Sequence, residues 1–595
     1  MSDDIKHECA VAMVVLRRPP SAIGDFGGTK LSLLLEKQHN RGQDGAGAAI
    51  LASDPEPGEA PYWIAKSASS TPLVDVLGAI GKRRVPPRER IFLGHLRYAT
   101  FGKNDTAFCH PFVHDASELE HTLLLAGNFN LTNASELFED YRHHGAFPTS
   151  RSDGYLVCEM IAHELASGNL PRALSAALAN ADGAWTLCGA TGDGWAFATR
   201  DPHGIRPGYL YIDDDVAVVA SERPAIQAAF DVPPEAVKEL PPGKALVVSP
   251  DGEVMMSELS SDINAVPRPC SFERIYFSRA NDADIHRERK ALGAALVPQI
   301  LEAANAPVED IFFSYIPNSA RIAFHGLLEK LFKDALTQRH GDTEKIPPLD
   351  SVPQCLCVDK FPRFGEIAVK DAKFRTFIAD AAARREFYKH VYDVTYGLVC
   401  PGKDTLVVLD DSIVRGNTMK NAILPMLDRL GPKRIVIASS APPIRYPDCY
   451  GIDMSTLGEL VAFRALVNLL DGERGMGNGE RGMGNGEKVL REAFKKFLHV
   501  STCSTRQKHL NPLAALYDRF TDEQHCAEIA RLLTPPGMKA EVVVVYQTVE
   551  NLRRCLASDS IGDWYFTGEY PTPGGYRVLR KALENYLKKN DERSY

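Results

Sequence analysis

The sequence predicts a protein of mixed α/β and α+β class with a parallel sheet in its second half. Three observations support this. The 595 residues are enough for about three or four domains of roughly 150 residues, or for two large ones. The hydrophobic content of 44% and the charged content of 24% are ordinary for a globular protein. Two short apolar runs, residues 310–316 and 405–409, are each followed by a turn and then by a helical pattern.

The composition and charge also limit which binding partners and which cellular compartment we expect. The net charge of -9 argues against nonspecific binding to nucleic acid. No apolar run approaches the ~18 residues of a membrane helix, and residues 1–8 lack the apolar core of a signal peptide. The 12 cysteines are scattered over a long chain, so they do not indicate a disulfide framework. We therefore expect a cytoplasmic protein with no membrane or nucleic-acid partner.

The second half is organised around residues 405–418. A buried strand is expected at 405–409, and the loop after it leads into a helix that Gly431 ends. In open α/β sheets, ligands bind where a strand's carboxyl end meets a helix N-terminus, and the backbone N–H groups there favour phosphate. Asp410 and Asp411 can in addition hold ribose hydroxyls and a hydrated Mg²⁺. The pattern therefore predicts a sugar phosphate that carries a diphosphate, although an isolated Asp-Asp turn would be read only as a helix cap.

The same residues resemble the thirteen-residue signature of the phosphoribosyltransferases, which bind phosphoribosyl pyrophosphate (PRPP). The resemblance implies one Mg²⁺ per subunit, held by Asp410, Asp411 and Ser319, the last in the turn 317–320 after the strand at 310–316. Taken alone, that turn is an ordinary strand-to-helix connection. The PRPP-binding residues implied are Asp410, Asp411, Ser412, Ile413, Val414, Arg415, Gly416, Asn417 and Thr418.

In the first half, Cys9 directly precedes an expected strand at 10–16. A cysteine at this position is more often a core residue, and the polar segments 38–47, 94–102 and 126–133 are each ordinary loops. Together, and in this order, they resemble the glutaminase domain of the N-terminal-nucleophile amidotransferases. Residues 182–185, 199–207 and 218–222 extend the resemblance. It implies two stacked sheets between helical layers, an αββα arrangement.

Amide hydrolysis needs a nucleophile, a base and an oxyanion hole. The resemblance implies that Cys9 is the nucleophile and that removal of a propeptide, residues 1–8, frees its α-amino group to act as the base. It further implies that Arg97 holds the glutamine carboxylate, that Asp153 holds the ammonium group, and that Asn128 and the backbone N–H of Phe129 form the oxyanion hole. Phe129 stands where the family has glycine, and Asn40 interrupts the family's Gln-His-Arg-Gly run.

The complete set of motifs resembles the glutamine-dependent amidophosphoribosyltransferases, over most of residues 9–460. That family opens purine synthesis by converting glutamine and PRPP to 5-phosphoribosylamine, pyrophosphate and glutamate. The resemblance also implies a homo-oligomer and feedback by purine nucleotides. The domain plan expected is a propeptide at 1–8, a glutaminase domain at 9–262, a phosphoribosyltransferase domain at 263–540 and a C-terminal segment at 541–595.

Several further segments carry their own expectations. Residues 237–248 suggest a closing hairpin, and 370–378 resemble the family's active-site loop. A glycine-rich tandem repeat makes 471–487 an expected disordered insertion. Some relatives with a propeptide bind a [4Fe-4S] cluster through four cysteines. Here Cys270 is retained, Cys449 is displaced by Asp448, and 562–565 lack both cysteines, so we expect no cluster.

Two other functions compete with this interpretation. The first is another glutamine amidotransferase, making amino sugars or asparagine, but neither an isomerase-like sugar domain nor a Ser-Gly-Gly pyrophosphatase loop is visible. The second is a non-catalytic PRPP-sensing module, which would need a DNA-binding element. The net charge of -9 and the lack of a basic helix-turn-helix argue against it.

Overall fold

The protein is described from a computed structural model. It covers residues 9–18, 25–52, 60–83, 88–99, 105–143, 145, 149–150, 152–259, 265–341, 362–370, 392–472, 485–500, 511–556 and 560–590. The predicted propeptide at 1–8 and most of the expected active-site loop, 371–378, lie outside the described residues.

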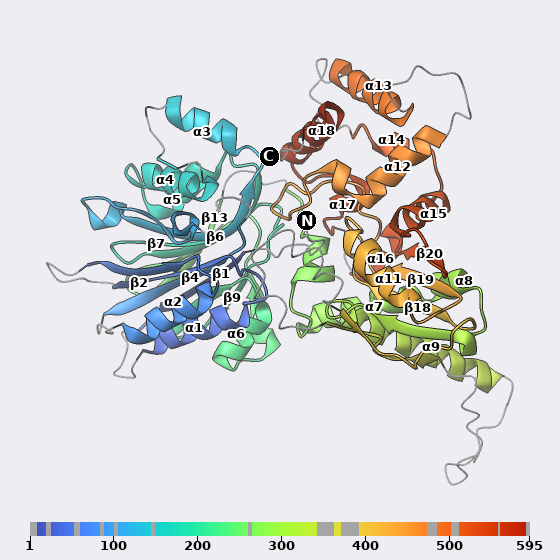
Figure 1. Cartoon of the computed structure of the whole chain (residues 1–595). Coiled ribbons are helices and arrows are strands. Elements are labelled where there is room, and N and C mark those ends of the chain that lie inside the picture. Colours follow the sequence, from blue (N-terminus) through green and yellow to red (C-terminus); the bar gives the residue numbers. More distant parts are fainter. Residues whose placement is uncertain are drawn as a thin grey trace, which may run out of the picture.

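The first half stacks two antiparallel sheets face to face (Figure 1). One has seven strands in the order β11-β9-β10-β1-β4-β2-β3, and the other has six in the order β13-β12-β8-β7-β6-β5. Val11, Met13 and Leu124 belong to the apolar layer between them. The strands are β1 Ala10–Leu16, β2 Gly45–Ala52, β3 Tyr62–Ser67, β4 Glu89–Arg97, β5 Phe112–His114, β6 Leu123–Leu131, β7 Gly183–Thr191, β8 Ala196–Arg200, β9 Tyr209–Ile212, β10 Val216–Ala220, β11 Lys238–Glu239, β12 Lys244–Val248 and β13 Val254–Glu258.

Helices cover both outer faces of this pair of sheets. The apolar sides of α1, α2 and α6 pack on the seven-stranded sheet, and those of α3, α4 and α5 pack on the six-stranded sheet. The predicted αββα arrangement is therefore confirmed. The helices are α1 Phe26–Lys37, α2 Pro72–Lys82, α3 Ala134–His143, α4 Asp153–Leu165, α5 Leu170–Leu178 and α6 Arg223–Phe230.

The second half contains the predicted parallel sheet, with five strands in the order β15-β14-β18-β19-β20. Helices α8 and α9 cover one face, and α11, α12 and α15 cover the other, because the strands carry apolar side chains on both sides. Two short strands, β16 Ala368–Lys370 and β17 Tyr392–Val394, pair separately. The elements are α7 Ala283–Ala295, α8 Val297–Ala304, β14 Ile311–Tyr315, α9 Arg321–Gly341, β15 Arg363–Phe364, β18 Thr405–Asp410, α11 Leu424–Asp428, β19 Arg434–Ser439, α12 Val461–Gly472, α15 Asp522–Leu533 and β20 Glu541–Tyr546.

A third core, rich in aromatic side chains, joins the two halves. It includes Trp564 and Tyr565 together with Ala184 and Ile205 from the first half. Asp182 adds a polar connection, since its carboxylate accepts hydrogen bonds from the Thr572 hydroxyl at 2.6 Å and the Gly574 N–H at 2.8 Å. The surrounding helices are α13 Asn485–Val500, α14 Ala514–Tyr517, α16 Val549–Cys555, α17 Trp564–Thr567 and α18 Pro573–Lys588.

Three expectations need correction. β11 and β12 do not form a hairpin, because they belong to different sheets and Gly243, with φ of 68°, turns the chain between them. The boundary expected at 540/541 cuts through the parallel sheet, because β20 pairs with β19. The ends of the expected insertion 471–487 are helical, since α12 reaches Gly472 and α13 begins at Asn485, while 473–484 lie outside the described residues.

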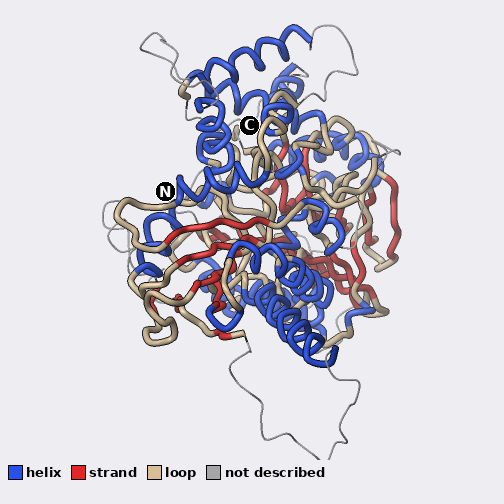
Figure 2. Tube along the Cα trace, turned by 90° about the vertical axis from the view of Figure 1, so that its right-hand side faces the viewer, coloured by secondary structure: helices blue, strands red, loops and turns tan. Residues whose placement is uncertain are grey.

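Figure 2, turned by 90°, shows the strands in the middle of the molecule with helices around them. In the portion of the chain that the structure covers, every helix is too short or too polar to cross a membrane.

Candidate active sites

Cys9 lies at the end of the seven-stranded sheet, directly before β1. Its sulfur accepts a hydrogen bond from the Tyr98 N–H at 3.3 Å. Ala10 pairs with Leu96 on the neighbouring β4, which places Cys9 beside Arg97. Desolvation raises the pKa of the Cys9 thiol to about 11, although the Tyr98 peptide and Arg97 partly oppose the shift. The thiol is therefore protonated at neutral pH and needs a base in order to react.

The two residues expected to hold glutamine lie near this thiol. Arg97, the last residue of β4, is buried, and Asp153 is the first residue of α4. The charges of both act on Cys9. Burial raises the pKa of Asp153 to about 6, against the opposing effects of the Gly154 N–H and Arg97. One buried cation and one carboxylate beside a thiol match the two charged ends of an amino acid.

The expected oxyanion hole lies on β6. Asn128 is 3% exposed, and within the described part of the chain its side-chain nitrogen has no hydrogen-bond partner. Such a buried, unsatisfied donor is rare and is suited to an acceptor that arrives with the substrate. Phe129 is an extended strand residue paired with Trp185, so a conformation restricted to glycine is not required there. Its ring would lie 3.0 Å from a Cβ at position 154, beside Asp153.

In the second half, the loop after β18 and the turn after β14 meet. The Ser319 hydroxyl donates a hydrogen bond to Asp411 Oδ2, and the Ser412 hydroxyl donates to Asp411 Oδ1 at 2.8 Å. Gly416 has φ of 77°, in the left-handed region that favours glycine. The hydrogen bond between Ser319 and Asp411 therefore supports the sequence-based prediction that these two residues act together.

A cavity of about 730 Å³ opens at this loop, which is a size suited to a small-molecule ligand. Its lining includes all but one of the nine expected PRPP-binding residues and also Ser319; the exception is Asn417. Arg415 lines the cavity, but its guanidinium is turned to Glu459, at 2.8 Å. Its side chain is thus engaged by the protein.

Sequence reasoning missed several residues of the same cavity. Arg279, Arg289 and Arg321 line it, and they bring positive charge to a site expected to bind a diphosphate. Arg289 is 4% exposed, and burial lowers its pKa to about 10, against the effect of Asp411. The sequence contained one signal for Arg289. This arginine falls on the buried side of the helical pattern at 287–300, where charged residues are uncommon.

The two halves of the chain meet at the polar loop 38–43. Asn40 and Gln43 come from the first half, yet both line the cavity of the second half. The Asn40 amide donates to the Phe277 carbonyl at 3.4 Å. The residue that interrupts the family pattern therefore lies at the contact between the two halves.

Comparison with known proteins assigns the chain to a family. Residues 109–228 match the model of a glutamine amidotransferase domain. The amidophosphoribosyltransferase of Bacillus subtilis (strain 168) is 31% identical over 435 residues, which cover 72% of this chain and 79% of the relative. The chain belongs to the amidophosphoribosyltransferase family. It is an enzyme of this type and carries out the glutamine-dependent first step of purine biosynthesis.

Other amidophosphoribosyltransferases give the same result. Amidophosphoribosyltransferase 2, chloroplastic, of Arabidopsis thaliana is 28% identical over 467 residues, covering 76% of this chain and 72% of the relative. The solved glutamine PRPP amidotransferase from B. subtilis, complexed with ADP and GMP, has a TM-score of 0.63 at 22% identity, covering 95% of this chain and 97% of that one. A structure described as the allosteric regulatory enzyme of purine biosynthesis has a TM-score of 0.64 at 24% identity, covering 95% and 96%. These structures support the fold.

The donors at the cavity beside Asp410 and Asp411 suit the Mg²⁺ that the family resemblance implies. Asp410 and Asp411 supply carboxylate oxygens, and Ser319 and Ser412 supply hydroxyl oxygens next to Asp411. Mg²⁺ prefers oxygen ligands and retains several of its waters. These residues would hold the ion.

The residues at the positions of the [4Fe-4S] ligands do not suit a cluster. Cys270 Sγ lies 3.2 Å from the Tyr565 hydroxyl. The backbone of Cys270 forms an isolated parallel β-bridge with Gly562. The Asp448 carboxylate accepts a hydrogen bond from the Trp564 indole at 3.3 Å. All four named side chains are at most 1% exposed. A cluster needs four thiolates, whereas aromatic rings and a carboxylate occupy most of this region.

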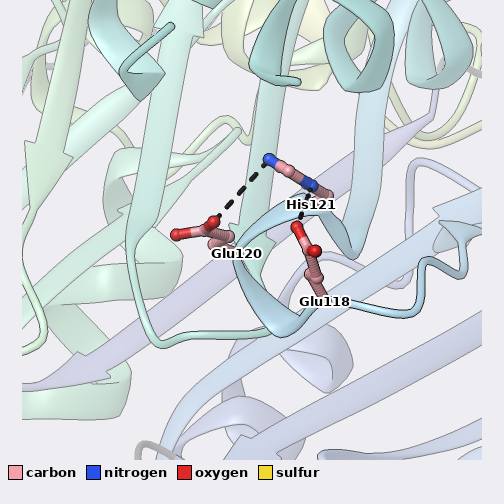
Figure 3. A group of neighbouring side chains, drawn as sticks. All are labelled: Glu118, Glu120 and His121. Carbon is pink, nitrogen blue, oxygen red and sulfur yellow. Dashed lines mark ion pairs between the residues drawn. The ribbon is translucent and has the colours of Figure 1, made fainter. Parts of the chain in front are cut away.

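Among the residues that the structure describes, one other group of side chains has metal-ligand chemistry. The potential ligand atoms of Glu118, Glu120 and His121 lie within 4.8 Å of one another (Figure 3). His121 is already paired with Glu118 at 3.1 Å, and both glutamates are exposed. We interpret this group as a surface ion-pair cluster.

Proposed function

We propose that the two sites act as a coupled pair. The first releases ammonia from glutamine, and the second uses it to displace pyrophosphate from PRPP, giving 5-phosphoribosylamine, pyrophosphate and glutamate. The observation that carries this proposal is the shared loop: Asn40 and Gln43 belong to the glutaminase half but line the cavity of Asp410 and Asp411. Ammonia released near Cys9 would then have a short internal path to ribose C1.

At the first site, removal of residues 1–8 would make Cys9 the N-terminal residue. Its α-amino group, with a pKa near ~8, accepts the thiol proton as Sγ attacks the amide carbon. The high pKa of the thiol, about 11, makes such a base necessary. The Asn128 amide and the Phe129 N–H stabilise the oxyanion. The same proton passes to the departing nitrogen, ammonia leaves, and water then hydrolyses the thioester to glutamate.

At the second site, the loop at 410–418 holds the sugar phosphate and the turn at 317–320 faces the diphosphate. Asp410 and Asp411 would hold the Mg²⁺, which when bound would neutralise charge on the pyrophosphate leaving group. Arg289 and Arg321 add fixed positive charge along the same cavity. Ammonia attacks ribose C1 as the bond to the pyrophosphate oxygen breaks, and a proton leaves the new amine.

Three finer assignments complete the proposal. The enzyme binds one Mg²⁺ per subunit, contains no [4Fe-4S] cluster, and responds as a homo-oligomer to purine nucleotides. The aromatic packing of Trp564 and Tyr565 around Cys270 supports the second point. Every cysteine in the described portion of the chain is a free thiol, which supports a cytoplasmic location.

Separate damage to each site tests the proposal. Cys9→Ala should abolish use of glutamine but retain activity with free ammonia, because the second site is untouched. Asp410→Asn should abolish phosphoribosylamine formation from either nitrogen source. Cys400→Ala, an exposed free cysteine, is the matched control and should retain both activities. Glutamine use that survives Cys9→Ala would refute the assignment.

A further inference from the structure

Two histidines of the first half bind the backbone of Gly127 on β6, one at its C=O and one at its N–H. His95 Nε2 lies 3.0 Å from the Gly127 carbonyl oxygen, and the Gly127 N–H donates to His110 Nδ1 at 3.2 Å. Because a carbonyl only accepts, His95 carries its hydrogen on Nε2. Because the Gly127 N–H donates, His110 Nδ1 is bare and its hydrogen is on Nε2. The His110 ring is therefore neutral in a single tautomer, and the His95 ring carries a hydrogen on Nε2.

The two rings are stacked, with centroids 4.0 Å apart and planes 8° from parallel. His95 is fully buried, and His110 is 9% exposed. Gly47 of β2 pairs with His95, and a Cβ at Gly47 would lie 1.8 Å from the His110 carbonyl oxygen. Only glycine fits at position 47, so β2 can lie this close to His95 and His110 only because it has glycine there.

Gly127 directly precedes Asn128 and Phe129, the two residues of the proposed oxyanion hole. The Trp185 carbonyl accepts from the Asp201 N–H at 2.9 Å, and the Trp185 N–H donates to the Asp201 carboxylate, so both groups point toward β8. The opposing pair Phe129–Trp185 is therefore a non-hydrogen-bonded pair of the ladder, and the Phe129 N–H points away from β7. The Gly127 N–H, two residues earlier, points to the same side.

We propose that His95 and His110 are positioning residues for glutamine hydrolysis, which orient the Phe129 N–H and the Asn128 amide by fixing the backbone N–H and C=O of Gly127. This inference rests on the proposed roles of Asn128 and Phe129. Neither histidine is assigned a contact with substrate. His110 also packs against the Phe129 ring, with centroids 5.7 Å apart, so it contacts β6 at two points.

The surroundings keep the pair neutral. Burial lowers the pKa of His95 to about 3 and that of His110 well below its usual value. The charged groups that face the pair are Lys66 on β3 and Arg97 on β4, and both disfavour a further positive charge. Phe112 of β5 contributes an apolar ring, 4.6 Å from His110 between centroids. Protonation would remove the acceptor that holds the Gly127 N–H.

The test compares His110→Gln, whose amide oxygen can still accept the hydrogen bond, with His110→Leu, which cannot. Glutamine hydrolysis, ammonia-dependent activity and alkylation of Cys9 by iodoacetamide are measured on the processed enzyme. For His110→Leu we expect kcat for glutamine to fall about 100-fold, as for the loss of an oxyanion donor. KM, the ammonia-dependent activity and the alkylation rate of Cys9 should change little, because alkylation forms no oxyanion. His110→Gln should restore most of the lost kcat.

Equal kcat in His110→Leu and the wild-type enzyme would overturn the proposal. So would a parallel loss of Cys9 alkylation, which would indicate general damage, or failure of His110→Gln to exceed His110→Leu. If His110→Leu does not fold, His95→Gln and His95→Leu supply the same comparison at the Gly127 carbonyl, with the same deciding outcomes. Asn128→Ala is assayed alongside: normal glutamine hydrolysis in that variant would refute the oxyanion-hole assignment itself, separately from the role of the histidines.

Discussion

Arg41 and Glu273 form a buried ion pair between the two halves of the chain. Arg41 donates to the two Glu273 carboxylate oxygens at 3.0 and 2.7 Å, and its Nε donates to Glu222 at 2.7 Å. Arg41 is 1% exposed. The two glutamates raise the pKa of Arg41 despite its burial. Arg41 follows Asn40, which lines the cavity beside Asp410 and Asp411, so the pair fixes the loop that reaches this cavity.

Replacing one partner of this pair should destabilise the protein. Glu273→Gln keeps the side-chain shape but removes the charge, and we expect a loss of about 3 kcal/mol in the free energy of unfolding. Urea unfolding measures it. Glu139→Gln breaks an exposed ion pair with Arg142 and should change the free energy by less than about 0.5 kcal/mol. Similar values for both variants would contradict the importance of the buried pair.

Ser319 should affect the requirement for Mg²⁺. Loss of the Ser319 hydroxyl in Ser319→Ala frees Asp411 Oδ2 from its hydrogen bond and removes a candidate oxygen ligand. We expect the half-saturating Mg²⁺ concentration to rise by about tenfold. Ser319→Thr keeps the hydroxyl and should remain near the wild-type value. Glutamine hydrolysis measured without PRPP should be unchanged in both, and an unchanged Mg²⁺ requirement in Ser319→Ala would be evidence against the assignment.

The pH dependence of glutamine use should report Asp153. In the free enzyme the pKa of this carboxyl is raised to about 6, so below pH 6 it is protonated and has lost the charge that would hold the glutamine ammonium group. Because the proposed α-amino base, with a pKa of ~8, also becomes protonated, kcat/KM for glutamine should already decrease below about pH 8. We expect the decrease to steepen as the pH falls through about 6, with the added loss mainly in KM. Asp153→Asn should have low kcat/KM and lack this step. A wild-type profile that is flat from pH 5 to 7 would contradict the prediction.

The elements predicted from local patterns are confirmed where the pattern is strong. The strands at 405–409 and 310–316 are β18 and β14, because apolar runs bounded by turn residues are buried on both faces of a parallel sheet. The αββα layers were implied by resemblance and are present. The expected residues Ser319 and Asp411 are in contact although 92 positions separate them.

What the sequence did not reveal depends on long-range contacts. In the sequence, Arg41 and Glu273 look like ordinary charged residues, and only the fold buries them together. No local pattern indicates a partner 232 positions away. The same holds for Asp182, which binds Thr572 and Gly574. Strand propensity also does not indicate which sheet a strand joins. For this reason the expected hairpin of β11 and β12 and the expected boundary just before β20 were wrong.

The central claim is that the two sites work as one coupled enzyme. The most direct test measures glutamate and pyrophosphate together from purified, processed protein supplied with glutamine, PRPP and Mg²⁺. The two products should appear in equal amounts, and omission of PRPP should strongly reduce glutamate formation. Glutamate formed at the same rate without PRPP, or with no matching pyrophosphate, would contradict the account.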